Sequence, residues 1–263
     1  MHWILQDNLF NEAAYQVLRE TLERFGISHS VHKVIPFVGE LVDDVPVNHQ
    51  NIICMGSYSL RHLAKRNGWN PGVFDLEPYD FTVQLKHWSS HMLNADAKVV
   101  KFMDIDFGQH EELFLRPIED SKVFSGGVFT KEDTYDWIHK VVNLGENYGN
   151  SLTKNTLVQV CSLKPIYVEA RFWVIQGKII TASIYKRGSR VIYTDDVPEC
   201  YFDYVRDRID EWQPHEAFVI DVADTPDGMK IVEINTINSA GFYAANIPKL
   251  VAAFEEAFND PAH

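Results

Sequence analysis

Three side chains near the carboxyl end of the chain have the chemistry of a divalent-cation site. Asp221 lies in the apolar run "AFVIDVADT", and Glu233 and Asn235 lie two apart in "KIVEIN". Side chains alternate along a strand, so Glu233 and Asn235 share a face, and the turn at 226–228 folds the runs into a hairpin. Two nearby carboxylates repel unless a cation lies between them, and oxygen ligands favour Mg²⁺. The alternative is that Asp221 caps the hairpin while the other two face solvent.

Basic side chains upstream have the character of a phosphate-binding set. Arg116 ends the apolar strand "LFLRP", and Lys122 precedes Gly126 and Gly127, where backbone amides can approach an anion closely. A metal-bound nucleotide needs such cations, so they favour the metal interpretation of the hairpin. For the glycine-bearing loop the alternative is a plain hairpin connection, because its spacing matches neither the Walker nor the dinucleotide motif.

Arg171 lies inside "YVEARFWVIQGK", an otherwise apolar strand. Burying an unpaired guanidinium is costly, so Arg171 needs an acid or a ligand phosphate beside it. Glu169 shares its face at a spacing of two and is the candidate acid. Arg187, at the end of the next strand, and Arg190 are expected at the surface, where one of the two could reach a phosphate.

Composition limits the classes of partner. The chain has 263 residues, 46% of them hydrophobic, which is enough for a large core, and its formal charge of -13 opposes binding to nucleic acid or an anionic membrane. No apolar run approaches the ~18 residues of a membrane span. Cys54, Cys161 and Cys200 lack metal-ligand spacing, which predicts buried thiols and a cytoplasmic protein. Nothing in the sequence indicates an oligomeric state.

Residues 1 to 75 have the pattern of a small alternating α/β unit. Strands are predicted at "HWIL", "SHSVHKVIPF" and "NIICM", and helices at "NEAAYQVLRETLERFG" and at "YSLRHLAKRNG". This alternation predicts a parallel sheet. Ser57 is predicted to cap the second helix, with a phosphate site at that turn as the lesser alternative.

From residue 97 onward the strands come in antiparallel-looking pairs. Strands are predicted at "AKVVKFMDI", "ELFLRPI", "TLVQVCS", "IYVEARFWVIQG" and "KIITASIYKRG", and helices at "KEDTYDWIHKVVNLGENYG" and "CYFDYVRDRIDEW". After the hairpin, "IPKLVAAFEEAFND" places four apolar side chains on one face and predicts a closing helix; they are Leu250, Val251, Phe254 and Phe258.

The order of these residues resembles the ATP-grasp superfamily, in particular the clade named for two arginines and a lysine, found among phage and bacterial proteins. The resemblance implies an α/β (α+β) fold of ATP-grasp type with a small N-terminal α/β pre-grasp domain. The implied boundaries are 1–75 for that domain and 76–263 for the ATP-grasp module. Within the module, the smaller subdomain would cover about 97–158 and the larger about 159–263.

The resemblance also implies a role for each polar residue. Asp221, Glu233 and Asn235 would hold Mg²⁺, with Asn235 also contacting the nucleotide. The phosphate contacts would be Arg116, Lys122, Arg171 and Arg187, with Arg171 and Lys122 as the catalytic pair at the reacting phosphoryl group. The position of Arg116 is often lysine in the wider superfamily, and a guanidinium is a fork where an ammonium is a point charge. Which of Arg116 and Lys122 meets the α- and β-phosphates therefore stays open.

Two further segments resemble parts of the same module. "LVQVCS" is similar to the hinge whose backbone binds adenine, which implies cofactor contacts at Gln159, Val160 and Cys161. "NSAGFY" is similar to a loop of the substrate pocket, with Asn238, Ser239 and Tyr243 as its polar contacts.

The function implied is a Mg-ATP-dependent carboxylate-amine or peptide-like ligase. The γ-phosphoryl group would pass to a carboxylate, and an amine would attack the acylphosphate, so no protein nucleophile is required. Its partners would be ATP and small-molecule, amino-acid or peptide substrates. The alternatives are a nucleotide-binding regulatory or structural protein without ligase activity, and a kinase-like phosphotransferase on the same fold.

Overall fold

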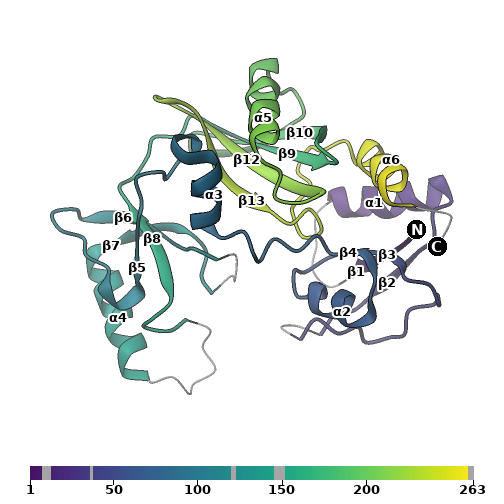
Figure 1. Cartoon of the computed structure of the whole chain (residues 1–263), viewed down its shortest axis with the longest axis horizontal. Coiled ribbons are helices and arrows are strands. Elements are labelled where there is room, and N and C mark those ends of the chain that lie inside the picture. The colour runs from purple at the N-terminus through teal and green to yellow at the C-terminus, as the bar shows by residue number, and fades with distance from the viewer. Residues whose placement is uncertain (8–12, 36–37, 120–122, 145–151, 260–263) are drawn as a thin grey trace. The chain divides into compact units, whose positions relative to one another are not determined.

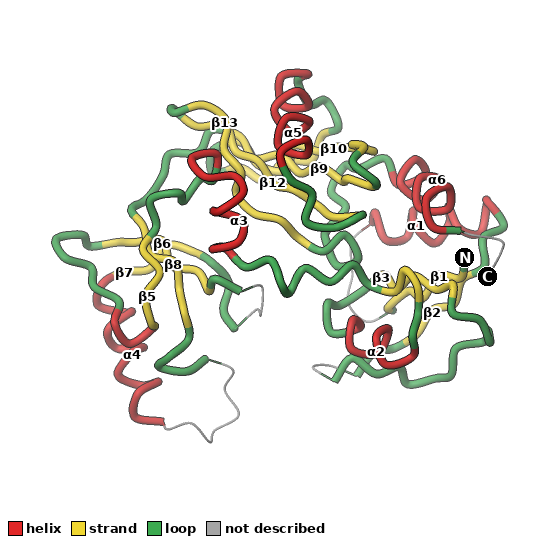
Figure 2. The backbone as a smooth tube through the Cα atoms, viewed as in Figure 1, coloured by secondary structure: helices red, strands yellow, loops and turns green. Residues whose placement is uncertain are grey.

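The computed structural model describes residues 1–7, 13–35, 38–119, 123–144 and 152–259, which form two compact units (Figures 1 and 2). The first unit comprises Met1–Asp75, Tyr167–Asp224 and Ile231–His263, and the second comprises Leu76–Ile166 and Thr225–Lys230. The fold is mixed α/β, as the sequence predicts. The boundaries implied by the resemblance stay a prediction; a boundary at residue 159 would fall inside a strand.

The amino-terminal part of the first unit is a four-stranded parallel sheet. Its strands are β1 (His2–Gln6), β2 (His29–His32), β3 (Asn51–Met55) and β4 (Asn70–Gly72), in the order β2-β1-β3-β4. Every adjacent pair is parallel, which confirms the prediction from the alternating pattern. The crossover helices are α1 (Ala13–Phe25) and α2 (Leu60–Asn67).

The predicted cap of α2 is wrong. The helix begins at Leu60 with Ser59 as its N-cap residue, and no side chain forms a capping hydrogen bond. Ser57 instead lies in the preceding turn, where its backbone N–H donates to Gln6 Oε1 at 2.7 Å. The turn occupies residues that sequence reasoning assigned to the helix start, so the first helical residue comes later.

The rest of the first unit is built around a five-stranded sheet in the order β11-β10-β9-β12-β13. Its strands are β9 (Val168–Ile175), β10 (Lys178–Arg187), β11 (Arg190–Thr194), β12 (Ala217–Thr225) and β13 (Gly228–Asn235). The central strand β9 is buried along its whole length and pairs antiparallel with both β10 and β12. The predicted turn at 226–228 joins β12 to β13 as a hairpin. Helices α5 (Glu199–Glu211) and α6 (Ile247–Phe258) complete this part.

One core connects the two sheets of the first unit. Helices α1 and α6 lie side by side (Figure 1). Leu250, Val251 and Phe254 of α6 are buried as the sequence predicts, and Phe258 is partly buried against them. The same core contains side chains of both sheets, including Trp3, Leu5, Ile53, Met55, Trp173, Ile175, Ala217 and Val219. The amino-terminal sheet and the five-stranded sheet are thus packed through shared helices.

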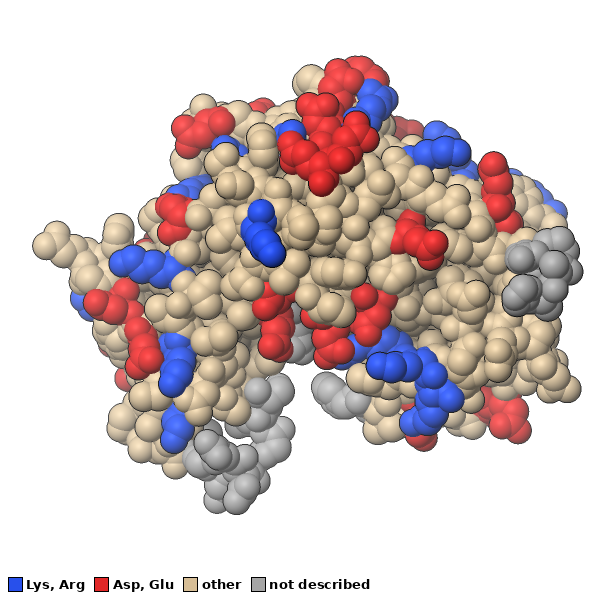
Figure 3. All heavy atoms as spheres, in the orientation of Figure 1, with Lys and Arg blue, Asp and Glu red and all other residues tan. Residues whose placement is uncertain are grey.

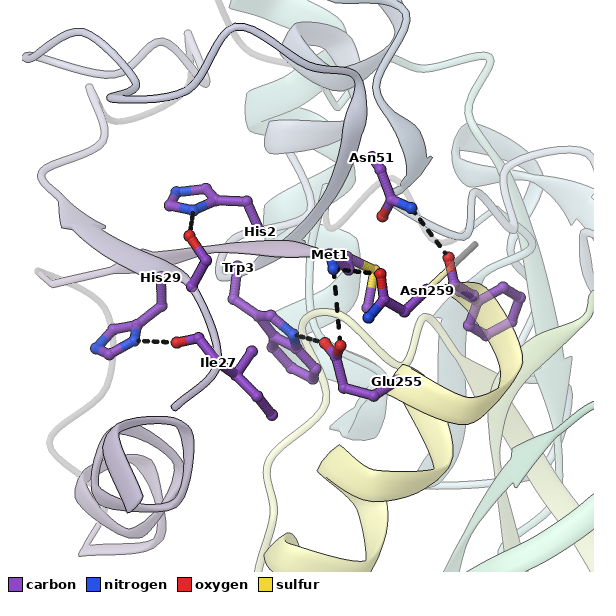
Figure 4. Close-up of polar contacts among 10 residues, drawn as sticks. Met1, His2, Trp3, Ile27, His29, Asn51, Glu255 and Asn259 are labelled. Atoms are coloured by element: carbon purple, nitrogen blue, oxygen red, sulfur yellow. Dashed lines mark hydrogen bonds and ion pairs between the residues drawn. The ribbon is translucent and has the colours of Figure 1, made fainter. Parts of the chain in front are cut away.

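Polar contacts tie strands β1 and β3 to α6 (Figure 4). Trp3 Nε1 donates to Glu255 Oε1 at 2.6 Å, and Asn51 Nδ2 donates to the Phe258 carbonyl at 3.4 Å. On the other side of β1, His2 Nδ1 lies 2.7 Å from Ser28 Oγ. The contacts of Trp3 and Asn51 join segments at opposite ends of the sequence, whereas the His2 contact stays within the amino-terminal part.

The second unit contains an antiparallel sheet in the order β5-β8-β6-β7. Its strands are β5 (Lys98–Lys101), β6 (Glu112–Pro117), β7 (Gly127–Thr130) and β8 (Leu157–Cys161). Its helices are α3 (Phe81–Trp88), α4 (Lys131–Leu144) and two 3-10 turns, Ser89–His91 and Phe102–Asp104. Trp137 of α4 packs edge-on against Phe102 at 4.8 Å between ring centroids, which closes the core of this unit.

The cysteines and the surface qualify the compositional predictions. Cys54 and Cys161 are buried, and burial raises the pKa of the Cys161 thiol to about 11. Cys200 is exposed in the first turn of α5, so the prediction of buried thiols is wrong for this residue.

Acidic side chains gather over α5 (Figure 3). Across the described ranges, no helix combines the length and the apolar character that a membrane crossing needs.

Candidate functional site

The most deeply buried ion pair near the predicted site joins Arg171 to Asp221. The two residues stand directly opposite each other on β9 and β12, so their side chains share one face of the sheet. Arg171 donates from Nε to Asp221 Oδ1 at 2.8 Å and from Nη2 to Oδ2 at 2.7 Å. The side chains are 8% and 1% exposed, so this two-point contact is shielded from water. Asp221 is therefore the acid that pairs with Arg171, and the expectation of Glu169 is wrong.

Glu169 has other partners on the neighbouring strand. Its carboxylate accepts from Lys186 Nζ at 2.7 Å and from the Tyr185 hydroxyl at 2.9 Å. Adjacent residues normally point to opposite faces of a strand. A register shift between Ile184 and Lys186 in β10 lets both side chains reach one carboxylate. Burial and the neighbouring carboxylates hold the pKa of Tyr185 well above its usual range, so its hydroxyl remains a donor.

The three predicted metal ligands lie together in the β12–β13 hairpin. Asn235 Nδ2 donates to Glu233 Oε1 at 2.9 Å, which fixes the amide beside the carboxylate. Burial raises the pKa of Asp221 to about 6; Arg171 opposes that rise, and Glu233 adds to it through its negative charge and a hydrogen bond. Asp221 and Glu233 are therefore close enough to repel each other. The alternative, in which Asp221 caps the hairpin while Glu233 and Asn235 face solvent, is not what the structure has: Asp221 pairs with Arg171, and the other two side chains are half-buried.

The donor set of this hairpin fits a hard divalent cation. It offers two carboxylates and one amide oxygen, and two negative charges face the single positive charge of Arg171. A cation beside Glu233 would relieve the repulsion that raises the pKa of Asp221. Across the described residues, this hairpin included, no three or more histidine, cysteine, aspartate or glutamate side chains are grouped to hold a metal ion, so the candidate set depends on the amide of Asn235 as its third ligand.

The loop that follows β13, residues 236–246, is attached to the amino-terminal sheet through Asn238. The Asn238 side chain accepts from the Phe74 backbone N–H at 2.9 Å and donates to the Cys54 carbonyl at 2.7 Å. The side chain is 3% exposed. It also accepts from the Thr236 hydroxyl and donates to the Gly72 carbonyl, so both ends of its amide are occupied. This placement favours a structural role for Asn238, although it was predicted as a substrate contact. Ser239 is half-buried beside it.

Tyr243, the third predicted contact in the 236–246 loop, lies against an aromatic cluster. Its ring stacks on those of Tyr185 and Tyr193, with each pair of centroids 5.0 Å apart. The Arg171 guanidinium carbon lies 4.8 Å from the centroid of the Tyr243 ring. Tyr243 has φ 51°, in the left-handed region that non-glycine residues rarely adopt, and this strain is held by the surrounding contacts.

Sequence reasoning missed Tyr185 and Tyr193. They flank the turn at Gly188 in "SIYKRGSRVIYT", and that pairing of aromatic residues on adjoining strands was the available signal. The register shift in β10 is not visible in the sequence, so alternation alone could not show which face Tyr185 occupies. Arg187 is exposed at the end of β10, as expected.

The remaining predicted residues belong to the second unit. Arg116 is half-buried at the end of β6, where a Cβ added at Gly126 would lie 2.9 Å from Arg116 Cδ; the glycine is needed for this close approach. Gln159 and Val160 lie in the interior of β8, paired with strands on both sides, and Cys161 ends that strand. Lys122 lies outside the described residues.

The two α/β units, the paired strands and the hairpin with its carboxylates and amide define an ATP-grasp fold. Solved structures of this fold resemble the chain over nearly its whole length. The RimK domain protein ATP-grasp from Sphaerobacter thermophilus is 13% identical, with a TM-score of 0.63 over 97% of this chain and 99% of that one. D-alanine–D-alanine ligase from Bacillus anthracis is 11% identical, with a TM-score of 0.60 over 98% and 97%. D-cycloserine synthetase DcsG is 12% identical, with a TM-score of 0.59 over 97% and 98%.

A family assignment comes from the sequence itself. Residues 54–254 match the model of an ATP-grasp domain family, the third family of the clade named for two arginines and a lysine. The chain therefore belongs to this ATP-grasp family, in agreement with the resemblance seen in the order of its residues. No curated protein matches the chain.

Proposed function

We propose that the chain is a Mg-ATP-dependent ligase that joins a carboxylate to an amine through an acylphosphate. The observation that carries the proposal is the grouping of Asp221, Glu233 and Asn235 beside the buried Arg171. Family membership supports ATP as the phosphoryl donor, and the solved ATP-grasp ligases of similar fold support ligation as the reaction class.

Each charged group has a proposed role. Asp221, Glu233 and Asn235 would hold Mg²⁺, which supplies charge neutralisation to the nucleotide phosphates. Arg116 and Lys122 are proposed to contact the phosphates, with the backbone of the Gly126 loop close to Arg116. The reaction transfers the γ-phosphoryl group to a substrate carboxylate oxygen, and the amine then displaces phosphate from the acyl carbon. ADP, phosphate and the new amide are the products.

The substrates are proposed by chemical class. A ligase with AMPPNP and a precursor peptide, PsnB, is 12% identical to this chain with a TM-score of 0.55 over 98% of each chain, and D-alanine–D-alanine ligase acts on an amino acid. These relatives support amino-acid or peptide carboxylates and amines as the substrates. Ser239 and Tyr243 in the 236–246 loop are the proposed polar contacts of that pocket.

The first test is nucleotide binding measured by thermal denaturation. A ligand that binds only the folded state stabilises it by about 2.7 kcal/mol at one hundred times its dissociation constant. We expect ATP to raise the melting temperature in a Mg²⁺-dependent manner in the parent chain and in Glu216→Gln, an exposed residue ahead of β12. We expect Glu233→Gln to lose the Mg²⁺ dependence while keeping its melting temperature without ligand.

The second test is turnover. ADP release should require both a carboxylate and an amine, and it should be abolished in Glu233→Gln. Nucleotide binding with no ADP release across a broad panel of amino acids and peptides would contradict ligation and favour a regulatory nucleotide-binding protein. A stable phosphorylated product without any amine would favour a phosphotransferase.

A further inference from the structure

Arg171 makes contacts that a simple phosphate-binding arginine would not make. Its Nε and Nη2 groups are held by the two oxygens of Asp221, and Nη1 donates to the Gly241 carbonyl at 3.3 Å. Its guanidinium also lies against the ring of Tyr243. These contacts use three of the five N–H donors of the guanidinium, so its orientation is set from two sides by the protein itself.

Gly241 and Tyr243 belong to the 236–246 loop, which is fastened on both sides of them. Before them, Asn238 holds the loop to β3. After them, the Ala244 N–H donates to Ser183 Oγ at 3.2 Å and the Asn246 N–H donates to Thr181 Oγ1 at 2.9 Å, both on β10. Between these attachments, Arg171 contacts the loop from the sheet beneath.

We propose that Arg171 is a positioning residue that couples the Asp221 carboxylate to the 236–246 loop. One edge of the guanidinium sets the orientation of Asp221, and Nη1 and the cationic face set Gly241 and the strained Tyr243. The metal-binding carboxylate and the acceptor pocket are thereby aligned by a single side chain. The functional part of this inference rests on the proposed function, because it takes Asp221 as a metal ligand and the loop as part of the pocket.

The coupling predicts that a substitution at Asp221 raises the rate of hydrogen exchange in the 236–246 loop. Hydrogen exchange of peptides spanning residues 239–246 measures this directly in the free chain, without nucleotide or metal. Arg171→Lys keeps the positive charge but cannot contact Asp221 and Gly241 together, and Asp221→Asn removes the charge that holds Arg171. We expect exchange in the loop to rise by about tenfold in both variants.

Arg206→Lys is the matched control, because Arg206 is an exposed residue of α5 whose guanidinium contacts Glu199, Asp203 and the Phe202 ring of the same helix. Its loop exchange should equal that of the parent chain. Unchanged loop exchange in Arg171→Lys and Asp221→Asn would overturn the proposal. Unfolding of a variant would appear as raised exchange in β1 and β9 as well, and Tyr243→Leu then serves as the second variant, since it removes the loop side of the contact and leaves the Arg171–Asp221 pair intact.

The reciprocal effect is read from the metal. We expect Arg171→Lys and Tyr243→Leu to raise the Mg²⁺ concentration at the midpoint of the ATP-dependent thermal shift by between about 10-fold and 100-fold, as for other residues that orient a metal ligand. Binding of ATP without Mg²⁺ should be unchanged in both. Loss of metal-free ATP binding with normal loop exchange would mean that Arg171 contacts the nucleotide instead. If the parent chain itself shows no Mg²⁺ dependence, the proposed function fails, while the exchange data still decide whether Arg171 couples Asp221 to the loop.

Discussion

His2 predicts a loss of stability in mild acid that can be calculated from its surroundings. The side chain is 1% exposed in β1, where Nδ1 lies 2.7 Å from Ser28 Oγ and Nε2 lies 2.8 Å from Ser30 Oγ (Figure 4 shows the first contact). The ring of His49 lies 6.5 Å away between centroids. Burial lowers the pKa of His2 from 6.5 to about 4, and the positive charges of His49, His32, His29 and the Met1 amino group contribute to this lowering in that order.

The direction of the effect follows from this lowered pKa. Above pH 6.5, His2 is neutral in both the folded and the unfolded chain, so it takes nothing from the free energy of unfolding. Between pH 6.5 and about pH 4, the unfolded chain takes up a proton that the folded chain does not, so the free energy of unfolding falls as pH falls. Since a tenfold change in proton affinity is about 1.4 kcal/mol, His2 alone accounts for a loss on the order of 3 kcal/mol by pH 4.

The assay is urea unfolding of the parent chain and of His2→Gln at intervals from pH 7.5 to pH 4. Glutamine keeps a donor and an acceptor for the two serines but does not titrate. We expect His2→Gln to be less stable than the parent chain near pH 7 and to lose less stability on acidification, with the difference in slope approaching one proton. His62→Gln is the matched control, because His62 is exposed on α2.

Carboxylates and other histidines also titrate in this range, so the slope of one chain alone proves nothing. Equal slopes for the parent chain and His2→Gln would refute the reasoning, because the cost of protonating His2 would then be the same in the folded and unfolded states. A flattening of the slope in His62→Gln equal to that in His2→Gln would be equally incompatible with it, because the effect would then not depend on the buried site of His2.

Three further substitutions test other parts of the structure. Asn238→Ala leaves buried backbone groups without partners and should destabilise the chain by about 1–3 kcal/mol in urea unfolding, whereas Ser239→Ala should be nearly neutral; equal effects would contradict the structural role of Asn238. Gly126→Ala places a Cβ against the Arg116 stem and should weaken ATP binding in calorimetry, while Gly127→Ala meets only an ordinary contact at 3.5 Å and should not. Phe254→Ala should cost about 3–5 kcal/mol in urea unfolding, because its ring is fully buried, and a cost below about 1 kcal/mol would mean that the shared core is not closed there.

The sequence was sufficient for features that depend on local periodicity. The face shared by Glu233 and Asn235 follows from alternation along one strand, and the buried face of α6 follows from helical spacing. The two parallel crossovers of the amino-terminal sheet follow from alternating strands and helices. These inferences need only neighbours within a few residues.

Features set by strand register could not be read from the sequence. The partner of Arg171 lies 50 positions away and is chosen by the pairing of β9 with β12, so the local candidate, Glu169, was the wrong acid. The bulge in β10 rotates Tyr185 and Lys186 toward one carboxylate, which simple alternation forbids. Strands β4, β7 and β11 and helix α3 were not predicted, because they are short and lack a clear period. Helix α2 begins at Leu60, two residues later than predicted, because residues 58 and 59 belong to the preceding turn.

The shared core of the first unit has a consequence for the order in which the chain can fold. Trp3 and Glu255, which are 252 positions apart, are hydrogen-bonded, and Trp3 also packs edge-on against Phe254 at 5.5 Å between centroids. During synthesis, the apolar face of β1 is therefore fully covered only after α6 has been made. The aromatic core cluster of the second unit comes from residues 100–160, so its members are all synthesised well before that point. We expect the middle of the chain to fold on the ribosome and the amino-terminal sheet to remain a client of chaperones until α6 emerges.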